Sequence, residues 1–178
     1  MNIRRRLQPG MRVKKFHNGG KGPGHPHMDE EKLKRGVSAV ESASGTLMMN
    51  PHSTATGLYG QLYSEIDQEL YMDNVSREEF RDSIPLQEDV WEKRMSGDIS
   101  GVPGLRKNAQ DLTDEYSGQL GDKWNYSPDE VAAISNFLGR QGARNYFAAV
   151  RDNKKYTPPG MNKTVEQYLK EYREATNE

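Results

Sequence analysis

Apolar residues recur at helical spacing through most of the chain after residue 28, and hardly any segment alternates as a strand would. The clearest case is the C-terminal segment, residues 163–178. Its sequence KTVEQYLKEYREATNE places Val165, Tyr168, Leu169 and Tyr172 on one face of a helix. This pattern predicts an all-α fold, or an α-dominated α+β fold.

Helix start and stop signals divide the chain further. Ser127-Pro128-Asp129-Glu130 joins an N-cap, a proline in the first turn and two acids. Ser76 followed by Glu79 forms a capping box for a short helix, and Gly97 is suited to end the next helix. Helices are predicted over residues 29–45, 58–71, a short stretch after Ser76, 85–97, 105–120, 128–139, 141–150 and 163–178.

Residues 1–28 differ from the rest of the chain in charge. They hold seven cations and no acid, whereas the other 150 residues hold 18 basic and 26 acidic residues, a net charge of −8. The segment has too few apolar residues to offset the entropy of ordering it. We therefore expect an extended basic arm, residues 1–28, attached to one folded body, residues 29–178. Three arginines of the arm are predicted to dock on an acidic partner: Arg4, Arg5 and Arg6.

The composition argues against several other classes of protein. The chain has no cysteine, which excludes a disulfide framework and thiolate metal sites. No apolar run approaches the roughly 20 residues of a membrane span, and no apolar stretch of a secretory signal follows the N-terminal charges. His25-Pro26-His27 has no second cluster to complete a tetrahedral metal site. We expect neither a metal nor a cofactor.

Glu41 is the candidate catalytic residue. It follows Val40 at the edge of the apolar face, in the last turn of the helix predicted over residues 29–45. The negative end of the helix dipole is an unfavourable place for a carboxylate and tends to raise its pKa. A solvated glutamate at an ordinary helix end would fit the same position. The neighbouring residues therefore decide between a solvated glutamate and a catalytic one.

Glu41-Ser42 is followed by the segment Ser53-Thr54-Ala55-Thr56-Gly57-Leu58-Tyr59-Gly60-Gln61. This arrangement resembles the lytic transglycosylase family, whose lysozyme-like domain carries Glu-Ser, a loop and then a Ser-x-Ala-x-Gly-Leu-x-Gln segment. NYSPDEVAAISNFLGRQGARNYFAAV and the final NKTVEQYLKEYRE are similar to later segments of such domains in phage virion proteins. The resemblance spans about residues 30–175.

The resemblance implies a lysozyme-like fold and an enzyme that cleaves peptidoglycan between N-acetylmuramic acid and N-acetylglucosamine. In this family one glutamate, here Glu41, donates a proton to the glycosidic oxygen. It then accepts the proton of the muramyl 6-hydroxyl, which closes a 1,6-anhydro ring; both steps need a pKa near neutrality. Contacts to the sugars are expected from Ser53, Tyr59, Gln61, Asn136 and Tyr146. The resemblance also implies a virion protein that acts at the host cell wall or periplasm during genome delivery.

The chain departs from the family pattern in three places. Gly57-Leu58-Tyr59-Gly60-Gln61 is one residue longer than the usual Gly-Leu-Met-Gln. The glycine that normally lies close behind Glu-Ser appears only at Gly45, and Asn136 stands where the family has a Tyr or His. These differences keep a second hypothesis open, namely a virion connector or plug that retains the fold without the activity.

Two further alternatives concern neighbouring carboxylates and the arm. Glu65 and Asp67 would permit ordinary hydrolysis, although helical spacing places both on a solvent-exposed side. The arginines of the arm would also bind DNA phosphates without sequence preference, as a DNA-packaging accessory does. We favour docking of the arm on another virion protein, with nonspecific DNA contact as the second choice.

Overall fold

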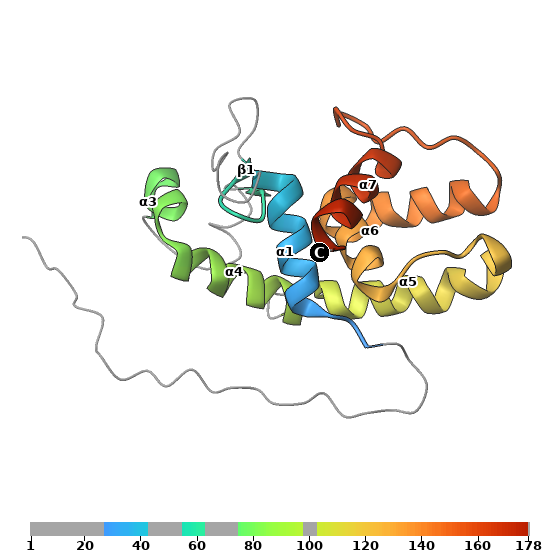
Figure 1. The fold of residues 1–178 in the computed structure, drawn as a ribbon, viewed down its shortest axis with the longest axis horizontal. Coiled ribbons are helices and arrows are strands. Elements are labelled where there is room, and N and C mark those ends of the chain that lie inside the picture. Colours follow the sequence, from blue (N-terminus) through green and yellow to red (C-terminus); the bar gives the residue numbers. More distant parts are fainter. Residues whose placement is uncertain (1–26, 43–54, 63–74, 98–102, 178) are drawn as a thin grey trace, which may run out of the picture.

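A computed structural model of the chain describes residues 27–42, 55–62, 75–97 and 103–177 (Figure 1). Helices dominate these residues, which confirms the predicted helix-rich class. Two strands of two residues each pair antiparallel, with Ala55 opposite Leu62 and Thr56 opposite Gln61. The elements in chain order are α1 (Glu30–Ser42), β1 (Ala55–Thr56), β2 (Gln61–Leu62), α3 (Arg77–Asp82), α4 (Ile84–Ser96), α5 (Leu105–Leu120), the 3₁₀ turn η1 (Gly121–Lys123), α6 (Pro128–Arg151) and α7 (Val165–Thr176).

Local signals set several of the helix boundaries as predicted. Ser76 and Ser127 each cap a helix through a complete capping box, in which the glutamate three residues later binds back to the cap nitrogen. Gly97 ends α4 in the left-handed conformation, with φ at 83°. The predicted break near the middle of the long α6 is also present, because Gly139 leaves helical geometry with φ 70° and ψ 168°.

The helix predicted over residues 58–71 is wrong at its start. Residues 57–60 form a turn, and residues 61–62 form β2. Leu58 and Leu62 have helical spacing, but Gly57 and Gly60 take positive φ angles of 82° and 60°, which favour a tight turn over a helix. The rest of that prediction, residues 63–71, lies outside the described residues.

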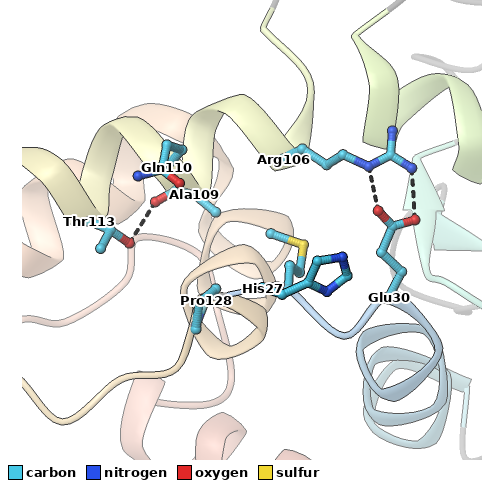
Figure 2. A pocket seen from close by; sticks show the side chains of 8 residues that line it. His27, Glu30, Arg106, Ala109, Gln110, Thr113 and Pro128 are labelled. Atoms are coloured by element: carbon cyan, nitrogen blue, oxygen red, sulfur yellow. Dashed lines mark hydrogen bonds and ion pairs between the residues drawn. The ribbon is translucent and has the colours of Figure 1, made fainter. Parts of the chain in front are cut away.

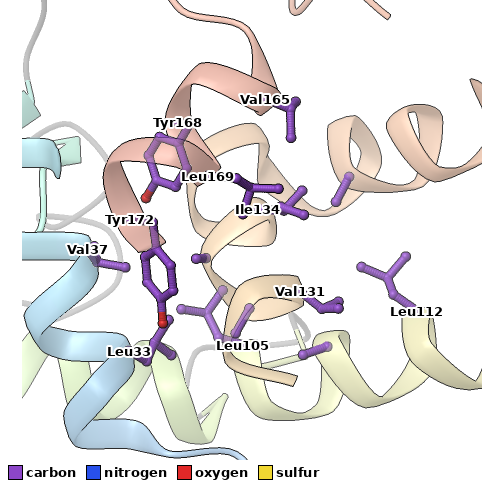
Figure 3. Close-up of a cluster of buried hydrophobic side chains, with 14 of the residues drawn as sticks. Leu33, Val37, Leu105, Leu112, Val131, Ile134, Val165, Tyr168, Leu169 and Tyr172 are labelled. Atoms are coloured by element: carbon purple, nitrogen blue, oxygen red, sulfur yellow. The ribbon is translucent and has the colours of Figure 1, made fainter. Parts of the chain in front are cut away.

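The main core lies between α1, α4, α5, α6 and α7 (Figure 3). The four apolar residues predicted on the C-terminal helix are all buried there. Trp91 is fully buried, and the partly buried Trp124 packs against the same cluster. Helix α1 approaches α7 so closely that a Cβ at Gly36 would lie 2.3 Å from the Tyr172 ring. The fully buried side chains of this cluster include Leu33, Val37, Trp91, Met95, Leu112, Val131, Ile134, Phe147 and Tyr172.

A second, smaller cluster joins α3 to α4. Phe80 and Val90 are buried there, and Val75 and Leu86 pack partly buried against them. Figure 1 shows the β1 segment beside the C-terminal end of α1. In the described part of the chain, no helix combines the length and apolarity required to cross a membrane.

Candidate active site

Glu41 lies in the last turn of α1, half-buried, beside the turn of residues 57–60 that precedes β2. None of the ion pairs among the described residues involves its carboxylate. The neighbouring Ser42 turns its hydroxyl inward and donates to the Ser38 carbonyl at 2.9 Å. Glu41 is therefore a carboxylate without a direct counter-charge in the described part of the protein.

Burial raises the pKa of Glu41 from its ordinary 4.5 to about 7. Interactions with the Tyr168 hydroxyl and with the charges of Lys163 and Arg94 lower the pKa, and the charge of Glu171 raises it, but burial has the largest effect. The shift has the direction predicted from the sequence, with loss of solvent rather than the helix end as its main cause. The carboxyl group is thus close to half-protonated at neutral pH.

Tyr168 brings α7 to this carboxylate. Its side chain is 1% exposed, and its ring stacks on Phe137 with 4.3 Å between centroids. The hydroxyl interacts electrostatically with Glu41 and with Asn136 of α6. It nevertheless has no hydrogen bond of ordinary geometry among the described residues. Glu41 and Asn136 therefore flank the buried Tyr168 hydroxyl, which is suited to donate a hydrogen bond to either of them.

The turn of residues 57–60, called here the glycine turn, covers Glu41 from another side. A Cβ at Gly60 would lie 2.7 Å from the Glu41 Oε2 and 3.0 Å from its Cβ. Only a residue without a side chain fits so close to the carboxylate. The structure thus brings Glu41 and the Gly57–Gly60 segment together.

The glycine turn is also tied to α3 and α4. The Gln87 Oε1 accepts a hydrogen bond from the Leu58 nitrogen at 2.8 Å, and the Arg77 Nε donates to the Thr56 Oγ1 at 2.7 Å. Gln87 cannot be recognised from the sequence, because a buried glutamine in a polar helix has the same local pattern as a solvated one. From the sequence, Tyr168 is recognisable only as part of an apolar face.

Two aromatic residues predicted to contact sugar lie in the core. Tyr59 is 4% exposed, packs on Trp91 with 4.4 Å between ring centroids, and donates its hydroxyl to Glu88. Tyr146 is 3% exposed and shares a hydrogen bond of 2.9 Å with the Tyr126 hydroxyl. Core packing is sufficient to explain why Tyr59 and Tyr146 are buried. Their contacts to sugar stay predictions.

The remaining predicted residues are placed in part or not at all. Asn136 is half-buried at the site, as described above. Gln61 is placed by its backbone, which pairs with Thr56 in the hairpin directly after the glycine turn. Several residues considered in the sequence analysis lie outside the described residues: Arg4, Arg5, Arg6, His25, Ser53, Glu65 and Asp67.

Two hollows lie elsewhere on the molecule. One, of about 260 Å³, is bordered by His27, the α5 segment around Ala109, and Pro128, and Arg106 spans its edge to hold Glu30 through contacts of 2.5 and 2.7 Å (Figure 2). The other, of about 550 Å³, lies where α7 ends beside the start of α6. Glu41 lines neither of them. Within the described ranges, no group of three His, Asp or Glu residues is arranged to hold a metal ion.

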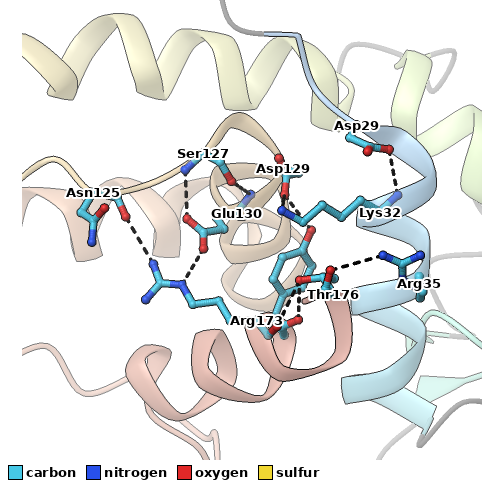
Figure 4. A network of polar contacts seen from close by, with 10 residues as sticks. Asp29, Lys32, Arg35, Asn125, Ser127, Asp129, Glu130, Arg173 and Thr176 are labelled. Carbon is cyan, nitrogen blue, oxygen red and sulfur yellow. Dashed lines mark hydrogen bonds and ion pairs between the residues drawn. The ribbon is translucent and has the colours of Figure 1, made fainter. Parts of the chain in front are cut away.

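The second hollow adjoins a network of partnered charges (Figure 4). The Glu130 carboxylate accepts hydrogen bonds from the Ser127 nitrogen at 2.9 Å and from the Arg173 Nε at 2.5 Å. The Asp129 Oδ2 accepts from the Tyr172 hydroxyl at 3.1 Å and lies 3.5 Å from the Lys32 Nζ. These acids hold the start of α6 to α1 and α7.

Comparison with models of known protein families, with curated proteins and with solved structures gives no match for this chain.

Proposed function

We propose that this protein is a lytic transglycosylase of lysozyme-like fold, with Glu41 as its single acid and base. Its substrate would be the β-1,4 bond between N-acetylmuramic acid and N-acetylglucosamine in peptidoglycan. The observation that carries the proposal is the Glu41 carboxyl group, which is buried beneath the glycine turn, has no ion pair among the described residues and has a pKa of about 7. Such a group can both give and take a proton near neutrality.

In the first step, protonated Glu41 donates its proton to the glycosidic oxygen. The bond from this oxygen to the anomeric carbon of the muramyl residue then breaks, and N-acetylglucosamine leaves with a free 4-hydroxyl. In the second step, the muramyl 6-hydroxyl oxygen bonds to the anomeric carbon while its proton moves to the Glu41 carboxylate. Glu41 is restored, no water is consumed, and the product carries a 1,6-anhydro ring.

The groups around Glu41 suit this chemistry. The Tyr168 hydroxyl is buried beside Glu41 and has no hydrogen bond of ordinary geometry in the described structure, so it is available to orient the carboxyl group. Asn136 is half-buried beside it and offers an amide suited to an N-acetyl group. Ser53 and Gln61 are the further sugar contacts that the resemblance suggests. The glycine turn excludes water from one side of the acid, which sustains the raised pKa.

We further propose that a phage particle carries the protein to the host cell wall, where it opens peptidoglycan during genome delivery. The motif resemblance and the basic arm support this proposal. Arg4, Arg5 and Arg6 would anchor the chain to an acidic surface of another virion protein, with nonspecific DNA contact as the alternative.

The test is analysis of the muropeptides released from purified cell walls. Wild-type protein should release 1,6-anhydro products, and Glu41→Gln should lower the rate by about 100-fold or more, because the proton donor is lost. Glu174→Gln is a matched control on the exposed face of α7 and should retain activity. If the folded wild type releases nothing between about pH 5 and 8, an inactive virion connector or plug becomes the better reading. Products without the anhydro ring would instead indicate hydrolysis.

A further inference from the structure

Gln87 holds the glycine turn from α4 with both ends of its side-chain amide. The residue is fully buried. Its Oε1 accepts from the Leu58 nitrogen at 2.8 Å, while its Nε2 donates to the Phe80 carbonyl at 2.9 Å and to the Arg81 carbonyl at 2.8 Å. One side chain therefore joins the turn to the corner between α3 and α4. A buried amide with this many partners is costly to replace, because each partner would lose its hydrogen bond.

The glycine turn is confined between two side chains. At one end, a Cβ on Gly57 would lie 2.8 Å from the Gln87 Oε1. At the other end, a Cβ on Gly60 would lie 2.7 Å from the Glu41 Oε2. Both glycines have positive φ angles, so the turn meets Gln87 and Glu41 with bare backbone. A displacement of the turn at Gln87 would therefore change how closely it covers Glu41.

We propose that Gln87 is a positioning residue, which holds the glycine turn against the Glu41 carboxylate and keeps water away from it. As a statement about catalysis, this inference deepens the proposed function and rests on it. The contacts themselves do not depend on any activity. Gln87 would act only through the turn, because its hydrogen bonds go to backbone groups of Leu58, Phe80 and Arg81.

Loss of the Gln87 amide should lower the pKa of Glu41. Water would then reach the carboxylate, and burial is the main reason that its pKa is raised. The other groups that face Glu41 are Tyr168 and Glu171 of α7, Lys163 just before α7, and Arg94 of α4. None of these four makes a hydrogen bond to Gln87 in the described structure, so the substitution should leave them in place.

The experiment is a titration of the glutamate side-chain carboxyl groups by ¹³C NMR in the full-length protein. The signal that is absent from Glu41→Gln identifies Glu41. In Gln87→Met, which keeps the length of the side chain and removes its hydrogen bonds, the pKa of Glu41 should fall by about 1 unit or more. The upper pH limit of wall cleavage should fall by the same amount.

Val90→Ala is the matched control. Val90 is buried in the α3–α4 cluster, three residues from Gln87, whereas Leu58 and Tyr59 of the glycine turn pack with the main core. Its side chain makes no hydrogen bond. Truncating it therefore weakens the same region through packing alone. Gly57→Ala is a second variant for use if Gln87→Met does not fold. It pushes the turn away from Gln87 while leaving the bonds to Phe80 and Arg81 intact, and it should also lower the pKa of Glu41.

The possible outcomes separate this inference from the proposed function. A lower pKa in Gln87→Met or Gly57→Ala, with no change in Val90→Ala, supports positioning by Gln87 even if the protein cleaves no cell wall. An unchanged pKa in the folded variants overturns the inference, and so does an equal fall in Val90→Ala. In either of those cases Glu41 could still catalyse cleavage, as muropeptide analysis would show.

Discussion

Carboxylates at opposite ends of α1 differ in their partners and in their position relative to a helix dipole. At the start of α1, Lys32 reaches Asp129, which with Glu130 occupies the first turn of α6. At the other end, Glu41 occupies the last turn of α1 and has no ion pair within the described residues. Asp129 and Glu130 lie where the helix dipole favours a negative charge, and Glu41 lies where it does not.

The difference shows how the surroundings of a structural acid differ from those of the candidate catalytic acid in this protein. The side chains of Asp129 and Glu130 are 6% and 11% exposed, and hydrogen bonds from Tyr172, Ser127 and Arg173 satisfy them. These hydrogen bonds compensate the two carboxylates for the solvent that they lose on burial. Glu41 is covered by the glycine turn at Gly60, which has no side chain, so burial removes solvent without supplying a charged partner. Its pKa rises to about 7 as a result.

The largest expected effect comes from adding a side chain to the turn that covers Glu41. Gly60→Ala would place a Cβ 2.7 Å from the Glu41 Oε2 at a position with φ of 60°, so we expect a loss of about 3 kcal/mol in the free energy of unfolding. Gly118→Ala in α5 is the control, because a Cβ there meets nothing within 4 Å; it should gain up to about 1 kcal/mol. Denaturant unfolding measures both. If Gly60→Ala is as well tolerated as the control, the glycine turn does not pack closely on Glu41. The difference in burial between Glu41 and the acids at the start of α6 would then need another explanation.

Glu41→Gln should stabilise the protein, and the gain should depend on pH. The pKa of Glu41 is about 7 in the folded protein and near its ordinary 4.5 in the unfolded chain, so the group is neutral in both states below pH 4.5. As pH rises from 4.5 to 7, the unfolded chain releases its proton while the folded protein keeps it, so the wild type loses stability; above pH 7 both states are charged and the loss is complete. Relative to wild type, the variant should gain about 2 to 3 kcal/mol between pH 4.5 and pH 8.5. A difference between the two proteins that stays constant over this range would contradict the raised pKa.

Asp129→Asn should have the opposite sign. The substitution removes the charge that Lys32 approaches and that the start of α6 favours, and it weakens the acceptor for the Tyr172 hydroxyl. We expect a loss of about 1 to 2 kcal/mol at pH 7. Thermal or denaturant unfolding beside Glu41→Gln at the same pH gives the comparison directly. Equal signs for the two substitutions would mean that the partners of Asp129 matter less than its burial.

Much of this contrast could be predicted from the sequence, because it depends on local signals. Ser127-Pro128-Asp129-Glu130 indicates a helix start, and the spacing of Leu33, Val37 and Val40 puts Glu41 in a last turn. Both predictions rest on interactions within about four residues along the chain. The buried face of α7 follows from the same periodicity.

What the sequence could not predict depends on contacts between distant segments. Gln87 meets Leu58 across 29 positions, and Tyr168 meets Glu41 across most of the chain; no local pattern encodes either contact. The glycine turn was predicted as helix because Leu58 and Leu62 have the spacing of one. Tertiary contacts with Gln87 and Glu41 instead hold that segment in a conformation that its two glycines permit.

The smallest expected effect compares two tyrosines one turn apart on α7. Tyr172 donates its hydroxyl to Asp129, whereas the Tyr168 hydroxyl beside Glu41 has no hydrogen bond of ordinary geometry in the described structure. Tyr172→Phe should therefore cost about 1 kcal/mol, because it leaves a buried carboxylate with one partner fewer. Tyr168→Phe should change the free energy of unfolding by less than about 0.5 kcal/mol, because the hydroxyl that it removes makes no hydrogen bond of ordinary geometry in the described structure. Unfolding of both variants in urea at pH 7 measures the difference.

Glu41 should respond to the same pair of substitutions in the reverse order. The Tyr168 hydroxyl lowers the pKa of Glu41, so Tyr168→Phe should raise that pKa slightly, and Tyr172→Phe should leave it unchanged. The tyrosine that contributes least to stability would then be the one that tunes the candidate catalytic acid. A Tyr168→Phe variant that is clearly destabilised, with an unaltered Glu41 titration, would instead place Tyr168 among the structural residues, as Tyr172 is.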